Sequence, residues 1–287
     1  MKNSYCKLLM LLPLALADVD AVAQLRLYKD GAVVYSMPYG MVDSVVFTPP
    51  RYATKPPQQV EGSAAAGKVA EAVDMGLSVK WASWNIGADG QFDPGDFFAW
   101  GEVNSGKRQY DWSSYYWIVE GYSDWSHISK YQAQDKMHVG CWYSPVGGTS
   151  TFDYTGDGRT QLTADDDAAT RHWGDKWRMP TLKEFADLCN PDNCVWQWKK
   201  AGTYEGNPVA GYLVTSRRTN KTIFLPATGV FDGATRQYAS QNGHYWSSSL
   251  NKNYTREAYG LVFYSGSRYG GYEDARSNGL CIRPVCP

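Results

Sequence analysis

Tyrosine and charged side chains are concentrated near the end of the chain, in segments rich in glycine and serine. Tyrosine gives a large contact area at low entropic cost, and arginine gives planar hydrogen bonding, so this composition is typical of surfaces that recognise other molecules. The competing interpretation is a solvated loop region with no special role. The candidate ligand-binding residues are Tyr254, Arg256, Tyr264, Arg268, Tyr269, Tyr272, Glu273, Asp274 and Arg276.

The patterns that would indicate catalysis or metal binding are incomplete. None of the four histidines belongs to a Ser-His-Asp-like arrangement, and the serines at 247–249 lack the Gly-x-Ser-x-Gly elbow. Residues 153–158 begin like a calcium loop, but the twelfth position, where an EF-hand needs a bidentate glutamate, is Ala164. A turn is therefore the favoured interpretation of this segment. No cofactor is expected, with calcium left open.

The cysteines form no recognisable framework of disulfides or metal ligands. Cys189 and Cys194 lie on either side of an expected helix end, so a disulfide is one alternative if their Cα atoms come within about 7 Å. Cys281 and Cys286 are five positions apart on an expected strand, so their side chains should point to opposite faces. Buried thiols or single partners in structural disulfides are favoured for them. Cys141 makes the count beyond residue 23 odd, which leaves at least one free thiol or an intermolecular bond.

The overall composition bounds the class of protein. The chain has 287 residues, is 43% hydrophobic and carries a net charge of -1, which suits one sizeable core plus a smaller element. It has no basic field to hold nucleic acid, and no later stretch approaches the ~20 apolar residues that span a bilayer. The 12 Trp and 21 Tyr fill a core or line a binding surface, and we expect the tryptophans mainly in the core.

The first 70 residues read as three consecutive segments. Residues 1–23 have a basic start and an apolar run before small residues, which predicts a signal peptide and export to the cell surface or beyond. Residues 24–48 predict a small β unit, with a turn at Asp30-Gly31 and a further short strand at 45–47. Prolines and a Gly/Ser/Ala run predict a linker over 49–70. The main domain then covers 71–287.

The main domain is organised around one strongly marked helix. Thr181 and Glu184 have the spacing of a capping box, which predicts a helix from Leu182 to Asn190-Pro191. A second short helix is expected over 164–172, capped by Thr163. Long loops, including 103–161, separate short strands, so we predict an α+β fold. The expected strands are 77–82, 97–102, 195–198, 212–216, 222–227, 245–249, 258–263 and 281–285.

Seven short motifs follow one another along the chain: Asp74–Ala82, Phe98–Glu102, Asp166–Ala169, Trp177–Thr181, Phe224–Ala227, Tyr245–Ser249 and Ile282–Cys286. Together they resemble the Fibrobacter major paralogous domain family of secreted bacterial surface proteins. The resemblance covers about residues 73–287, and the hairpin before it resembles an N-terminal module of secreted proteins of gut Bacteroidetes.

The Trp177–Thr181 corner and the terminal Arg-Pro-Val also resemble the formylglycine-generating-enzyme type of C-type lectin-like fold, which the variable proteins of diversity-generating retroelements share. The resemblance implies a ligand surface within residues 242–286. Alternation places Leu261 and Phe263 inward and Gly260, Val262 and Tyr264 outward. Residues 251–256 and 265–277 would be surface loops.

We therefore expect a C-type lectin-like domain in an exported, non-enzymatic protein that recognises an extracellular protein or a surface glycan. It would be a variable protein of a retroelement system or an ordinary member of the paralogous family. One alternative is an adhesive subunit of a bacterial surface appendage, assembled through the hairpin. The other is a copper-dependent oxidase of the formylglycine-generating type, although the two thiols of that family lie upstream of the terminal arginine strand. The ligand and the oligomeric state are left open.

Overall fold

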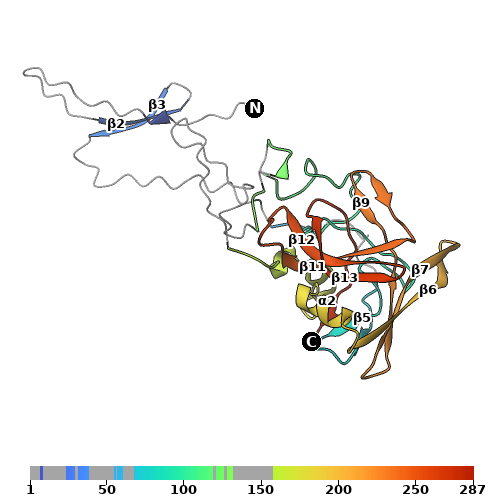
Figure 1. Cartoon of the computed structure of the whole chain (residues 1–287). Coiled ribbons are helices and arrows are strands. Elements are labelled where there is room, and N and C mark those ends of the chain that lie inside the picture. Colours follow the sequence, from blue (N-terminus) through green and yellow to red (C-terminus); the bar gives the residue numbers. More distant parts are fainter. Residues whose placement is uncertain are drawn as a thin grey trace, which may run out of the picture. The chain divides into compact units, whose positions relative to one another are not determined.

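The computed structural model describes residues 7–8, 24–29, 32–38, 55, 57–60, 68–118, 121–125, 128–131 and 158–287 (Figure 1). The chain divides into two compact units, Met1–Arg51 and Tyr52–Pro287. The strand expected at 45–47 and most of the signal segment lie outside the described residues. No helix of the described part is long and apolar enough to cross a membrane.

The first unit contains a three-stranded antiparallel sheet in the order β1-β2-β3. Strands β2 (Gln24–Lys29) and β3 (Ala32–Pro38) pair across Asp30-Gly31, where the sequence predicts the turn. The short β1 (Lys7–Leu8) pairs with β2 and comes from the expected signal segment.

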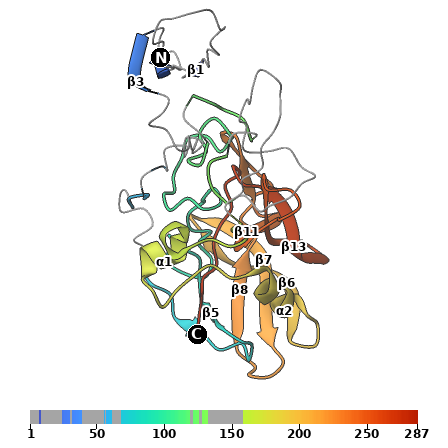
Figure 2. The ribbon, with the colours of Figure 1, turned by 90° about the vertical axis from the view of Figure 1, so that its left-hand side faces the viewer.

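The second unit is built mainly from small antiparallel sheets. Two three-stranded sheets follow the chain in the orders β6-β7-β8 and β11-β12-β13, and a third, β14-β5-β4, joins the two ends of the unit. Figure 2 shows β6, β7 and β8 running side by side. The strands are β4 (Ala72–Val73), β5 (Lys80–Ala82), β6 (Cys194–Tyr204), β7 (Asn207–Ser216), β8 (Thr222–Pro226), β9 (Val230–Asp232), β10 (Thr235–Gln237), β11 (Asn242–Leu250), β12 (Glu257–Tyr264), β13 (Ser267–Ala275) and β14 (Val285–Cys286).

The expected α+β class with a C-type lectin-like architecture is wrong. The structure is 39% strand and 9% helix, with its strands in several small antiparallel sheets. One reason is that segments expected to be loops pair as strands, such as 267–275 in β13. Conversely, the strand expected over 97–102 is reduced to a single bridge between Phe98 and Leu280.

The capping box of α2 (Leu182–Cys189) is confirmed. The Glu184 amide donates to the Thr181 hydroxyl (3.2 Å), and the Thr181 amide donates to the Glu184 carboxylate (2.7 Å). Arg178 holds the same carboxylate through two hydrogen bonds of 2.8 and 2.6 Å. The start of this helix is therefore fixed to the strand-like segment before it.

The second expected helix is broken in two, and its cap is wrong. A 3-10 turn, η3 (Ala164–Asp166), precedes α1 (Ala168–Trp173), and Thr163 makes no side-chain cap hydrogen bond. Asp167 caps α1 instead, because its carboxylate accepts from the amide of Thr170 (3.1 Å). The other carboxylate oxygen accepts from the amide of Met179 (2.8 Å), outside the helix.

The core of the second unit combines tryptophans with two fully buried arginines. Trp81, Trp100 and Trp246 are completely buried. Arg283 donates to Asn85 and to the carbonyl of Phe224, at 2.7 and 2.8 Å, so it joins the middle of β8 to the segment after β5. Burial lowers the pKa of this guanidinium to about 10.

Part of the expected linker belongs to this core. Gln58 is only 4% exposed, and its amide donates to the carbonyl of Gly101 (2.8 Å) and accepts from the amide of Val103 (3.1 Å). A buried amide with both ends paired fixes the backbone around it. Residues 57–60 are therefore a strap on the second unit rather than a loose connection.

Candidate recognition surface

One face of the β11-β12-β13 sheet packs against α2 and the β6-β7-β8 sheet. Phe263 is fully buried, with its ring 5.4 Å from Tyr212 and 6.1 Å from Trp196 between centroids. Gly270 on β13 lies so close to α2 that an added Cβ would come within 2.9 Å of the Phe185 carbonyl oxygen. This face is therefore closed.

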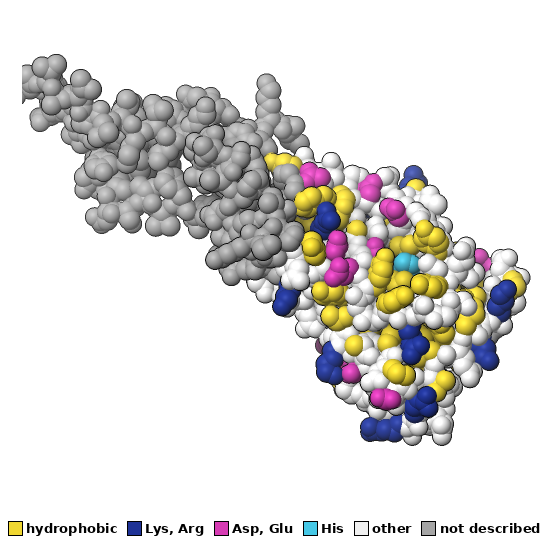
Figure 3. Space-filling model, viewed as in Figure 1, with side chains coloured by type: hydrophobic (Ala, Val, Ile, Leu, Met, Phe, Trp, Pro, Cys, Tyr) yellow, Lys and Arg dark blue, Asp and Glu magenta, His cyan; other side chains and the backbone are white. Residues whose placement is uncertain are grey.

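The opposite face carries exposed tyrosines. Directly paired residues of neighbouring strands share a face, and Val262 pairs with Tyr269 while Gly260 pairs with Tyr272. Tyr264, two positions beyond Val262, lies on the same face. Tyr264, Tyr269 and Tyr272 are 41%, 50% and 47% exposed, and we call these three residues the tyrosine face. Figure 3 shows hydrophobic side chains gathered over this sheet.

A β-bulge brings Tyr269 and Tyr272 to the same face. Side chains three positions apart on a regular strand point to opposite faces. The register shifts between Gly260 and Leu261, so Gly271 is an extra residue on β13. Its φ of +130° is open to glycine but strained for other residues. The Gly270-Gly271 pair therefore aims Tyr272 outward.

Two of the three tyrosine side chains contact each other. The hydroxyl groups of Tyr264 and Tyr269 lie 3.3 Å apart, with ring centroids at 6.2 Å. This hydrogen bond lowers the pKa of Tyr264 and raises that of Tyr269. The Tyr272 ring stands edge-on to His244 at 6.4 Å. The face therefore consists of a contacting pair, Tyr264 and Tyr269, and of Tyr272 beside His244.

His244 lies beside Tyr272 on the same face and is buried. It is 7% exposed, and neither ring nitrogen makes a hydrogen bond within the described part of the chain. Its Nδ1 is 3.5 Å from an oxygen of Asp274, which pairs with Ala258 on the same face. His244 was not among the predicted ligand residues, because nothing in its spacing distinguishes it from a core residue.

Two of the predicted ligand residues lie at the other end of the sheet. Tyr254 is 41% exposed, and Arg256 has its guanidinium carbon 5.1 Å from the Trp125 ring centroid. Both precede β12, whereas Tyr264 ends it, and eight strand residues span roughly 25 Å. Glu273 is exposed but pairs with Tyr259, so it faces away from the tyrosines. The nine residues therefore do not form one surface.

Arg276 is not a surface residue, and its predicted ligand role is wrong. It is completely buried and donates to the carbonyls of Tyr131, Thr255 and Lys130 at 3.1, 3.0 and 2.9 Å. It also donates to the Tyr115 hydroxyl (2.9 Å). Because main-chain carbonyls surround the guanidinium, its role is to join loops.

Three more expectations for this region need correction. Arg268 is half-buried, donates to the carbonyl of Cys189 (3.2 Å) and stacks on Trp196 on the closed face. Val262 does lie on the outward face, but it is only 6% exposed. The expected surface loop at 265–277 is largely β13, and its last two residues are buried.

The described cysteines offer no reactive pair. Cys189, Cys194, Cys281 and Cys286 are free thiols, so no disulfide joins the first two. Burial raises the pKa of Cys281 to about 12 and that of Cys194 to about 11, and the thiolate is the reactive form. Cys141 and residues 153–157 of the calcium-like segment lie outside the described residues. Among those described, no three His, Cys, Asp or Glu residues are grouped to hold a metal.

Comparison with known proteins gives one match, over a single segment. Residues 210–285 match the family described as "Domain of unknown function (DUF8237)". No curated protein and no solved structure matches the chain. The matched segment contains the tyrosine face but is less than half of the chain. The resemblance to the Fibrobacter paralogous family stays a prediction.

Proposed function

We propose that this chain is an exported, non-enzymatic recognition protein that binds an extracellular protein or a surface glycan through the tyrosine face. The observation that supports this is the clustering of exposed aromatic side chains. Among the described residues, three of the seven exposed large hydrophobic side chains lie on one face of one sheet. Clustered apolar side chains at a surface mark interaction sites more often than scattered ones.

The chemistry of the face suits an uncharged partner surface. The rings offer flat apolar contact, and their hydroxyl groups donate and accept hydrogen bonds at the rim. Asp274, close to His244, is the acidic side chain on this face, and it is partly covered. Binding would therefore depend on stacking and on hydroxyl hydrogen bonds more than on charge.

The proposal is tested by screening the full chain against surface glycans and intact bacterial cells. Tyr269→Ala and Tyr272→Ala should each weaken binding about 5- to 30-fold, the loss expected from truncating a tyrosine at the centre of an interface. Tyr238→Ala is the matched control, because Tyr238 is 51% exposed but is not on this face. Equal binding by all three variants would contradict the proposal.

A further inference from the structure

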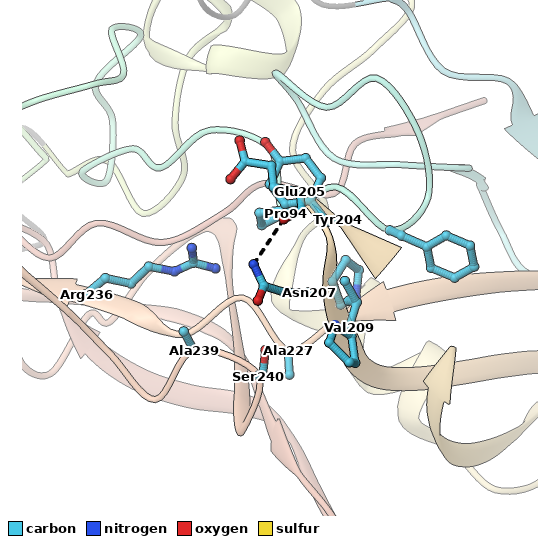
Figure 4. A pocket seen from close by; sticks show the side chains of 12 residues that line it. Pro94, Tyr204, Glu205, Asn207, Val209, Ala227, Arg236, Ala239 and Ser240 are labelled. Atoms are coloured by element: carbon cyan, nitrogen blue, oxygen red, sulfur yellow. Dashed lines mark hydrogen bonds between the residues drawn. The ribbon is translucent and has the colours of Figure 1, made fainter. Parts of the chain in front are cut away.

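A pocket of about 240 Å³ lies between the tip of the β6–β7 hairpin and the turn after β10 (Figure 4). The loop at 92–94 and the end of β8 complete its walls, and it shares no lining residue with the tyrosine face. Pockets for drug-sized ligands are larger, about 300–1,000 Å³. This pocket therefore suits a ligand the size of one amino acid.

Arg236 provides a fixed cation in the wall. Its Nε donates to the carbonyl of Thr228 (2.8 Å), and its guanidinium carbon lies 5.0 Å from the Phe97 ring centroid. No described residue accepts a hydrogen bond from its two terminal nitrogens. Figure 4 shows the side chain reaching toward Asn207. An arginine with a held stem and free terminal nitrogens is suited to bind a carboxylate in bidentate fashion.

Glu205 provides an anion at the hairpin tip. Tyr204, beside it, has a pKa raised by burial and then by the carboxylates of Asp93 and Glu205, so negative charge collects on this side. No salt bridge within the described part joins Glu205 to Arg236. Arg236 and Glu205 thus line one pocket without pairing with each other, and the Glu205 carboxylate lies beside the Tyr204 hydroxyl.

Glu205 also occupies a backbone position that disfavours it. Its φ is +50° and that of Gly206 is +77°, as in a two-residue turn that prefers Asn-Gly. The side-chain amide of Asn207 donates to the Glu205 carbonyl (3.2 Å) and holds the turn. A charged residue held in a disfavoured backbone conformation at the edge of a pocket is a candidate functional residue.

The remaining wall is apolar and firmly packed. Phe92 stacks edge-on against Phe224 at 5.2 Å, and an added Cβ on Gly202 would collide with its ring. Pro94, Pro208 and Val209 continue this wall. It offers a rigid surface for an apolar side chain of the ligand.

We propose that this pocket binds a free apolar α-amino acid, with its carboxylate on Arg236, its ammonium group on Glu205 and its side chain against the wall formed by Phe92 and Val209. This site is separate from the tyrosine face, and its ligand is a small molecule rather than a macromolecular surface.

The test uses the full chain and calorimetric titration with L-leucine as the probe. L-leucinamide lacks the carboxylate and N-acetyl-L-leucine lacks the ammonium group, so we expect each to bind at least tenfold more weakly. Arg236→Gln should reduce leucine binding to the level of leucinamide while leaving leucinamide binding unchanged. Glu205→Asn should reduce leucine binding to the level of N-acetyl-L-leucine while leaving the binding of N-acetyl-L-leucine unchanged. Asparagine suits the positive φ at this position, so the fold is retained.

Three results would overturn the proposal. They are no heat of binding for leucine at millimolar concentration, equal binding of leucine and its two analogues, or unchanged leucine affinity in both variants. Tyr269→Ala should leave leucine binding unaltered, because Tyr269 does not line the pocket. The glycan and cell-binding screen therefore tests the tyrosine face, and the leucine titration tests the pocket, independently of each other.

Discussion

The two faces of the β11-β12-β13 sheet differ in exposure, because β12 packs one set of side chains into the core and leaves Tyr264 at the surface. Phe263 and Tyr264 are neighbours on β12, yet Phe263 is completely buried while Tyr264 is 41% exposed. Alternation along a strand sends adjacent side chains to opposite faces. The closed face, packed on α2 and β7, therefore gives the tyrosine face a fixed backbone on which to hold its side chains.

The arginines give a second contrast between interior and surface. Arg256 and Arg276 come from the same part of the chain and share their chemistry. Arg256 is exposed, with Glu257 at 3.4 Å, whereas Arg276 is buried, with its guanidinium carbon 4.9 Å from the Trp100 ring centroid. Residue type therefore did not decide which arginine could meet a ligand. Arg276 is enclosed because main-chain carbonyl groups surround its guanidinium.

The largest expected effect comes from removing the buried arginine. Arg276→Met should lower the free energy of unfolding by about 3–5 kcal/mol, because three buried hydrogen-bond acceptors and one part-buried acceptor lose this donor. The measurement is equilibrium unfolding in urea. Arg256→Met is the control and should change stability by less than about 1 kcal/mol, as an exposed ion pair does. Similar losses in the two variants would remove the contrast.

A matched pair of truncations compares the two faces directly. Phe263→Ala should cost about 3–5 kcal/mol of unfolding free energy, because it leaves a cavity among Tyr212, Tyr245 and Trp196. Tyr264→Ala should change stability by about 0.5 kcal/mol or less and should act on ligand binding instead. Thermal and urea unfolding of both variants check the comparison. A large loss of stability in Tyr264→Ala would show that the tyrosine face also supports the fold.

The smallest effect concerns proton binding in the interior. Burial raises the pKa of Asp167 from 3.8 to about 6. The folded state then binds a proton more tightly than the unfolded state, so this stabilisation is complete below the unfolded pKa and is lost as pH rises through about 6. Relative to Asp167→Asn, the wild type should lose up to about 3 kcal/mol of unfolding free energy as the pH rises from the unfolded pKa of 3.8 through about 6. Parallel pH profiles for the two proteins would contradict this assignment.

Local signals in the sequence were reliable where neighbouring residues satisfy one another. The capping box at Thr181 and Glu184 and the pairing across Asp30-Gly31 needed no information from distant parts of the chain. The inward direction of Leu261 and Phe263 also followed from alternation within β12, and both are fully buried. Exposure of Tyr264, Tyr269 and Tyr272 agrees with the expected surface role of these tyrosines.

Other features depended on partners far away in the chain. The two glycines before Tyr272 indicate a bulge only once β12 is known to be the paired strand. The class of fold was mistaken because strand pairing, rather than local composition, turned 267–275 from a loop into β13. The strap at Gln58 likewise depends on Gly101 and Val103, more than 40 positions away.

The sequence by itself determined where α2 begins, which residues of β12 point inward and that the chain's end would carry tyrosines. Each of these depends on spacing over a few residues. Tertiary structure alone decided that Arg276 is enclosed, that Tyr269 and Tyr272 share a face, and that Arg236 and Glu205 line one pocket. Burial and proximity are properties of the packed chain, because they arise when segments distant in sequence exclude water together.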